Sequence, residues 1–204
     1  AIPLWRELLG EADRVPGGKA AALYHLGYCY HEADPPAPEE AAKQWEEALA
    51  LGGEEGRAAG LRLGLLHLDG SLPDPKRGLE KWSAALASLR SAADYDTRFI
   101  PIDEARGWFE NAFKTFMEGQ DFRSAEQLAL LYARLALPGK ADERLAEALH
   151  GMALEEREKI KGLPETVAVK KREELRGQFH RAAVAYEEAS SRLKEPLSAM
   201  WQAG

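Results

Sequence analysis

The sequence predicts an all-α protein built as a solenoid, an open row of stacked antiparallel helical hairpins. Two segments repeat each other at a spacing of 37 residues, as the pairs Gly27/Gly64 and Trp45/Trp82 show. A period of roughly 20 to 50 residues is typical of solenoids, whose units bury their apolar faces against neighbouring units. Helix-favouring residues dominate the composition and β-branched residues are scarce, so strand signals are almost absent.

Apolar residues at helical spacing, flanked by Gly or Pro, predict the helices of the N-terminal part. A short helix is expected at 3–13, followed by the first hairpin at 19–32 and 39–51. The second hairpin is expected at 55–68 and 76–89, with the turn "DGSLPDP" between its helices. Small residues at matching positions of both hairpins let the helices approach closely, and an indole fills the remaining space.

The segment "LGLLHLDGSLPDPKRGLEKWSAAL" (63–86) resembles the tetratricopeptide superfamily, and more closely its Sel-one-like variant. It has a Leu-Gly pair in the first helix, a longer Gly-containing turn, and an aromatic residue with Ala in the second helix. The resemblance covers 20–89, where His67 replaces the usual tyrosine and the first turn lacks the usual glycines. It implies a right-handed α–α superhelix that acts as a non-catalytic adaptor in protein complexes.

The repeat phase is lost after Leu89, so three regions are expected: 1–89, a connector at 90–102, and 103–204. The connector is a candidate hinge. The C-terminal region is predicted to hold a tetratricopeptide-like hairpin and a long helical hairpin, followed by the start of a further helix in "EPLSAMWQAG". The predicted helices of this region are 104–117, 123–136, 141–161 and 166–194.

The concave face of such a solenoid is lined by the first helix of each hairpin, and it is the predicted docking surface for a peptide or partner helix. Residues at i, i+4 and i+7 share one stripe of a helix. The candidate stripe consists of Tyr24, Tyr28 and His31 in the first hairpin and of Leu61, Leu65 and Leu68 in the second. The alternative is that the three leucines pack in the core.

Charge and composition narrow the partner classes. The net charge of −7 argues against nucleic acid, which needs a basic face, and weakly favours a basic protein or peptide partner. No apolar stretch approaches the roughly 20 residues that cross a bilayer. Residues 1–10 do not resemble a signal peptide. A single cysteine cannot form an internal disulfide, so cysteine content does not distinguish an oxidising from a reducing compartment. Cytoplasm and periplasm are both open as locations.

No catalytic residue, metal site or cofactor is expected. His25 and Cys29 are four residues apart on one helix, but a zinc site needs three or four ligands and packing explains them better. Asp94 and Asp96 are most simply part of a solvated turn, and Asp103 suits a helix N-terminus.

Two alternatives to the adaptor role stay open. Apolar faces at the ends of a solenoid predict a structural, self-assembling module, which would form homo-oligomers through those ends. The second alternative is a cell-envelope hydrolytic enzyme, which the resemblance implies through secreted bacterial proteins with the Sel-one-like pattern. That subgroup resembles a cysteine-paired scaffold, whereas this chain has one cysteine.

Overall fold

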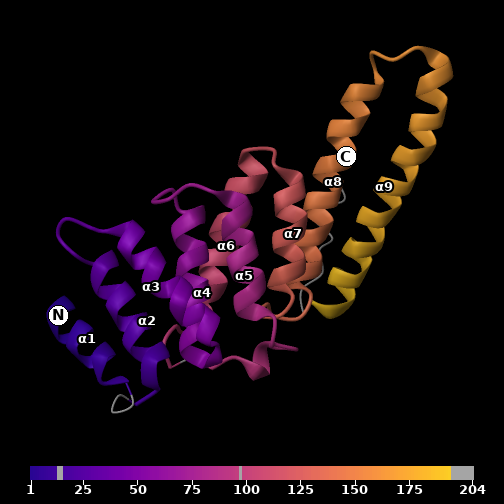
Figure 1. The fold of residues 1–204 in the computed structure, drawn as a ribbon. Helices are drawn as coiled ribbons and strands as arrows, with labels where there is room; N and C mark the ends of the chain where they lie inside the picture. The colour runs from indigo at the N-terminus through magenta and orange to yellow at the C-terminus, as the bar shows by residue number, and fades with distance from the viewer. Residues whose placement is uncertain (13–15, 97, 194–204) are drawn as a thin grey trace. The chain divides into compact units, whose positions relative to one another are not determined.

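The computed structural model describes residues 1–12, 16–96 and 98–193, and this part of the chain contains helices and loops without any strand (Figure 1). The all-α prediction is therefore confirmed for the described residues. The elements in chain order are α1 (Ile2–Gly10), α2 (Gly18–His31), α3 (Pro38–Leu51), α4 (Gly53–Leu68), α5 (Pro75–Leu86), the short 3-10 helix η2 (Ala92–Asp94), α6 (Ile102–Glu118), α7 (Phe122–Tyr132), α8 (Lys140–Ile160) and α9 (Glu165–Arg192).

The chain forms two compact units, Ala1–Trp108 and Phe109–Gly204, whose boundary falls within α6. In the first unit α1 lies against α2, α2 packs against α3, α3 against α4, and α4 against α5. In the second unit α7 packs against α8, and α8 packs against α9. In each of these pairs the two helices follow one another in sequence. None of the described helices is both long and apolar enough to cross a membrane.

The predicted helix ends agree with the structure to within a few residues, and the largest difference is at α7. The helix was expected to reach residue 136, but it ends at Tyr132. The next residues form turns, in which the N–H groups of Leu135 and Ala136 both donate to the Tyr132 carbonyl, at 2.9 and 2.8 Å. Pro138 disfavours helical geometry at Leu137, so these turns do not lead back into the helix. The predicted helix residues Asp13 and Lys194, and the segment "EPLSAMWQAG", lie outside the described residues.

The two repeated tryptophans occupy the same environment in their hairpins. Trp45 and Trp82 are 1% and 0% exposed. The indole N–H of Trp45 donates to the Tyr24 carbonyl at 3.1 Å, and that of Trp82 donates to the Leu61 carbonyl at 2.8 Å. The two acceptors are themselves 37 residues apart in the sequence. The sequence repeat therefore corresponds to a repeat of one packing arrangement.

A glycine lies against each indole. A Cβ on Gly27 would come within 2.5 Å of the indole nitrogen of Trp45, and a Cβ on Gly64 would overlap the ring of Trp82 in the same way. Only glycine lets the first helix of each hairpin approach the indole this closely. The small-against-large pattern predicted from the sequence thus sets the distance between the helices.

His67 holds the turn of the second hairpin. The side chain is buried, and its Nδ1 donates to the Leu72 carbonyl at 2.8 Å. In return the Asp74 backbone N–H donates to the His67 carbonyl at 3.1 Å. Asp74 also caps α5, because its carboxylate accepts from the Arg77 backbone N–H at 3.0 Å. These contacts fix where α5 starts after the longer turn.

The connector predicted as a hinge is anchored to the first unit. Tyr95 and Ile100 are 8% and 1% exposed, and the Tyr95 hydroxyl donates to the Ile100 carbonyl at 3.1 Å. Burial raises the pKa of Tyr95 to about 12. The Asp94 carboxylate accepts from the backbone N–H groups of Arg90 and Ser91, each at 3.0 Å. The connector is consequently packed as part of the unit.

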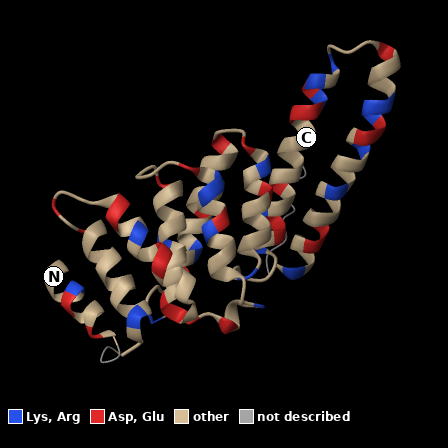
Figure 2. Ribbon diagram, viewed as in Figure 1, with Lys and Arg blue, Asp and Glu red and all other residues tan. Residues whose placement is uncertain are grey.

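In the second unit α8 and α9 form a long hairpin that extends past α7 (Figure 1). Acidic and basic residues are mixed along its outer part (Figure 2). Lys171 and Glu156 form an ion pair of 2.9 Å across the hairpin. Beneath these charges Ile160, Ala168 and Leu175 form a small core of their own. The outer part is thus held by apolar contacts, with solvated ion pairs outside them.

Candidate docking surface

The predicted stripe on α2 and α4 divides into buried and accessible residues. Leu61 is 0% exposed, as the core alternative for the leucines expects, and Tyr24, which was expected only on the docking surface, is 4% exposed and is corrected to a core residue. Both backbone carbonyls accept the tryptophan hydrogen bonds, which places these positions inside the hairpins. Tyr28 is 39% exposed. The half-buried residues of the stripe are His31, Leu65 and Leu68.

The half-buried residues differ in what they contact. His31 lies beside Trp45, with 5.6 Å between the ring centroids. Leu68 packs over Gly78 of α5, because a Cβ on Gly78 would come within 2.7 Å of its Cγ. Leu65 is three residues from Arg62 and shares its side of α4. Of the predicted stripe, Tyr28 and Leu65 remain closest to an accessible face.

Arg62 is at the centre of this accessible face, although the sequence prediction did not include it. Its guanidinium lies over the ring of Tyr28 at 4.8 Å and over the ring of Trp108 at 5.6 Å. Its Nε donates to the Tyr24 hydroxyl at 3.1 Å. We call these four residues, Tyr24, Tyr28, Arg62 and Trp108, the Arg62 cluster. Stacking on two rings and one hydrogen bond hold the guanidinium in a single orientation.

The chain itself covers one side of the cluster. Phe99 of the connector contacts the edge of Tyr24, with 5.0 Å between the ring centroids. His25 lies next to both of them and stacks on Trp5 of α1 at 4.5 Å. Burial lowers the pKa of His25, an effect that the carboxylate of Glu55 partly opposes. Phe99 of the connector therefore covers the Tyr24 edge of this face, and Trp5 of α1 reaches the neighbouring His25.

The acidic residues singled out from the sequence have structural roles. Asp94 forms a capping box with Ser91, the N-cap residue of η2, and Asp96 accepts from the Arg98 side chain at 2.9 Å. Asp103 pairs with Arg106 one turn later in α6, at 2.8 Å. Among the described residues, no three His, Cys, Asp or Glu side chains are grouped so that they could hold a metal ion.

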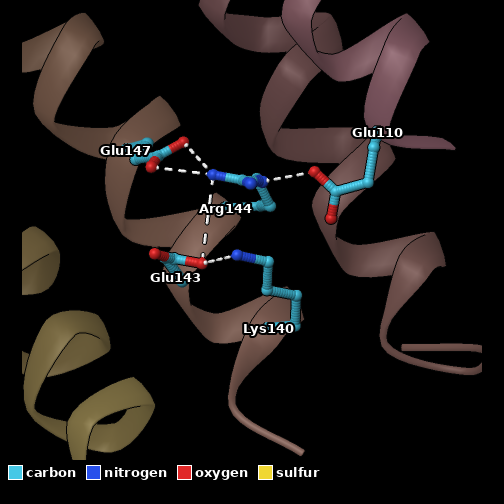
Figure 3. A network of polar contacts seen from close by, with 5 residues as sticks. All are labelled: Glu110, Lys140, Glu143, Arg144 and Glu147. Atoms are coloured by element: carbon cyan, nitrogen blue, oxygen red, sulfur yellow. Dashed lines mark hydrogen bonds and ion pairs between the residues drawn. The ribbon is translucent and has the colours of Figure 1, made fainter. Parts of the chain in front are cut away.

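A second polar cluster connects α6 to α8 in the second unit (Figure 3). Arg144 donates from Nε to Glu110 at 2.8 Å and from Nη1 to both oxygens of Glu147 at 2.9 Å. Glu143 lies 4.0 Å from Arg144 and pairs with Lys140 at 2.6 Å. The Arg144 side chain is only 19% exposed. We call these five residues the Arg144 network.

In this network the guanidinium of Arg144 lies close to three carboxylates, and this arrangement accounts for the directions in which the pKa values of Arg144 and Glu147 shift. Burial alone would lower the pKa of Arg144, but the carboxylates of Glu147 and Glu110 outweigh it and raise the pKa. The pKa of Glu147 is raised, mainly by burial. The attraction of Arg144 lowers this pKa, and the negative charge of Glu143 raises it further. Because Arg144 is shared, its attraction does not offset the burial of Glu147. The geometry is that of a clamp between α6 and α8.

No family model, curated protein or solved structure matches this chain.

Proposed function

We propose that the protein is a non-catalytic scaffold that binds a peptide or helix of a partner protein on the first unit. In this proposal the chain is a tetratricopeptide-like protein close to the Sel-one-like variant, and its hairpins form a right-handed solenoid. The main support is the shared packing of Trp45 and Trp82, whose indoles donate to carbonyls at equivalent positions. Repetition of one rigid hairpin is how solenoids build binding surfaces.

The docking surface of this proposal consists of Tyr28, Arg62, Leu65 and Trp108. Tyrosine, tryptophan and arginine are the residues that contribute most to binding energy at protein interfaces. Here the arginine is already ordered by Tyr24 and the two rings, so little side-chain entropy is lost when a partner binds. This surface carries a positive charge at its centre and therefore differs from the acidic balance of the whole chain.

The proposal is tested with a photo-crosslinking amino acid in the full-length chain, expressed in cells of its source. Benzoylphenylalanine at position 28 should crosslink to a discrete set of proteins. At position 83, which is an exposed serine of α5, the same amino acid should not crosslink to that set. In parallel, the double variant Tyr28→Ser with Leu65→Ser should lose capture of the set while keeping its helical content and melting temperature.

A matched control is Glu47→Ser, which changes an exposed residue of α3 and should leave capture unchanged. Capture that survives the double variant, or crosslinking from position 83 in place of 28, would show that this surface is not the docking site. Unfolding of the double variant, seen as a loss of helical content, would place Leu65 in the core and remove it from the surface.

A further inference from the structure

The second unit contains a pocket that the proposed scaffold function does not use. It lies where the turn between α6 and α7 meets α8 and α9, and its volume is about 290 Å³. That space corresponds to about ten water molecules. It is at the small end of the range for ligand-binding pockets. The residues around it come from three separate parts of the chain, including Gln120, Arg123, Lys159 and Gln178.

Gln178 of α9 brings an unsatisfied acceptor to this pocket. Its Oε1 is buried from bulk water, and no hydrogen bond to it is formed by the part of the chain that the structure describes. A buried acceptor without a partner is costly, so a ligand that offers an N–H or O–H there gains a hydrogen bond and relieves that cost.

Arg123 brings a cation. Within the described ranges, no carboxylate lies within 4.0 Å of its guanidinium. The other charges of the pocket are already engaged: Lys159 pairs with Glu155 at 2.6 Å, and Glu156 pairs with Lys171 at 2.9 Å. The carboxylate of Asp121 accepts from the Ser124 backbone N–H at 3.2 Å, which caps α7. The guanidinium of Arg123 is therefore the group in this pocket that suits an anion.

The backbone at the rim of the pocket is strained at Gln120. This residue has φ of 58°, in the left-handed region that favours glycine, while its neighbour Gly119 does not have a positive φ. The Gln120 N–H donates to the Met117 carbonyl at 3.1 Å, and the Asp121 N–H donates to the Phe116 carbonyl at 2.9 Å. Gln120 is therefore the left-handed residue that closes the end of α6, where glycine is usual. Gln120 thus adds an amide to the pocket at a conformational cost that glycine would avoid.

We propose that this pocket binds a small anion, a carboxylate or phosphate that also carries a hydroxyl or amine, with Arg123 holding the charge and Gln178 accepting from the donor. The pocket lies wholly within the second unit, so this site is independent of the docking surface on the first.

Four probes test the proposal by nuclear magnetic resonance titration of the isotopically labelled full-length chain. Glycerate and glycerol 3-phosphate carry both the charge and a hydroxyl, and they distinguish a carboxylate from a phosphate ligand. Propionate lacks the hydroxyl and glycerol lacks the charge. At least one of the first two probes should produce saturable shifts in the side-chain amides of Gln120 and Gln178. Propionate and glycerol should bind at least about ten-fold more weakly.

Variants then separate the site from nonspecific binding. Arg123→Gln and Gln178→Leu should each weaken the better probe at least about ten-fold. Arg181→Gln removes an exposed cation elsewhere on α9 and should leave the affinity unchanged. The proposal is overturned if neither anion gives saturable shifts, if glycerol binds as well as the anions, or if Arg123→Gln and Arg181→Gln have equal effects.

Discussion

The hairpins of the first unit and the α6–α8 contact of the second unit show two ways to hold helices together. In the hairpins a glycine lies against an indole, and the indole N–H donates to a backbone carbonyl. In the second unit a half-buried guanidinium connects carboxylates of two helices. The first arrangement is neutral, buried and repeated at a fixed spacing, whereas the second is ionic and partly solvated. We expect the first to be much less sensitive to pH and salt than the second.

The largest effect is expected from removing the indoles. Trp45→Ala and Trp82→Ala should each lower the free energy of unfolding by about 3–5 kcal/mol, because each removes a buried ring and leaves a cavity. Chemical denaturation of the full-length chain, with hydrogen exchange of α2 to α5 as the local probe, measures this. If the hairpins are equivalent units, the two losses should be similar. If the two losses in free energy of unfolding differ by more than about 2 kcal/mol, the two hairpins are not energetically equivalent although their geometry is the same.

A smaller loss is expected from Arg144→Ala. This variant leaves Glu110, Glu143 and Glu147 close together without their shared cation, and we expect a cost of about 2–3 kcal/mol. The value is below that of a fully buried pair because the side chain is 19% exposed. The control Arg157→Ala removes an arginine that is 54% exposed and should change stability by no more than about 0.5 kcal/mol. Equal effects of the two variants would contradict the clamp role.

A gain is expected from Gln120→Gly, which removes the left-handed strain at the rim of the pocket. The gain in unfolding free energy should be about 1 kcal/mol. The same variant should bind the anionic probe more weakly, since the amide is lost. Thermal unfolding and the titration above are measured on one sample. A variant that is less stable than the wild type would show that the Gln120 side chain holds the turn together.

The smallest effect is the pH dependence of Glu147. Its pKa is raised in the folded state, so the folded protein holds this proton more tightly than the unfolded chain does. The stability from this group is fully present below its ordinary pKa of 4.5 and is lost as the pH rises through the folded value. The wild type should therefore lose stability relative to Glu147→Gln as the pH is raised from about 4.5 toward neutrality.

The control for this titration is Glu158, whose pKa is lowered by its hydrogen bond to Lys161. Its contribution is present above its ordinary pKa and is lost as the pH falls, so Glu158→Gln should show the opposite slope. Denaturation at several pH values measures both differences. The same slope for both variants would rule out the shared-guanidinium account of Glu147.

The sequence was a good guide to the hairpins because their packing depends on residue size at a fixed spacing. The repeat of Gly27 and Trp45 as Gly64 and Trp82 is visible without coordinates, and it led to the correct helices. It was a poorer guide to the docking face. Tyr24 and Leu61 have the spacing of an exposed stripe, but their places in the core depend on the connector and the neighbouring helices.

Arg62 is a surface residue whose role the sequence did not predict. An arginine within a helix has no sequence signal of its own, and the role of Arg62 comes from Tyr28 and Trp108, which are far apart along the chain. The pocket formed by Arg123, Lys159 and Gln178 likewise brings together residues without a common motif.

The sequence by itself determined that the described chain is helical, where its helices lie and which residues separate them, because these depend on interactions between residues close along the chain. Only the tertiary structure decided which side chains remain accessible, how the connector packs, and which charges share a partner. These depend on contacts between distant segments, and such contacts leave no regular spacing in the sequence.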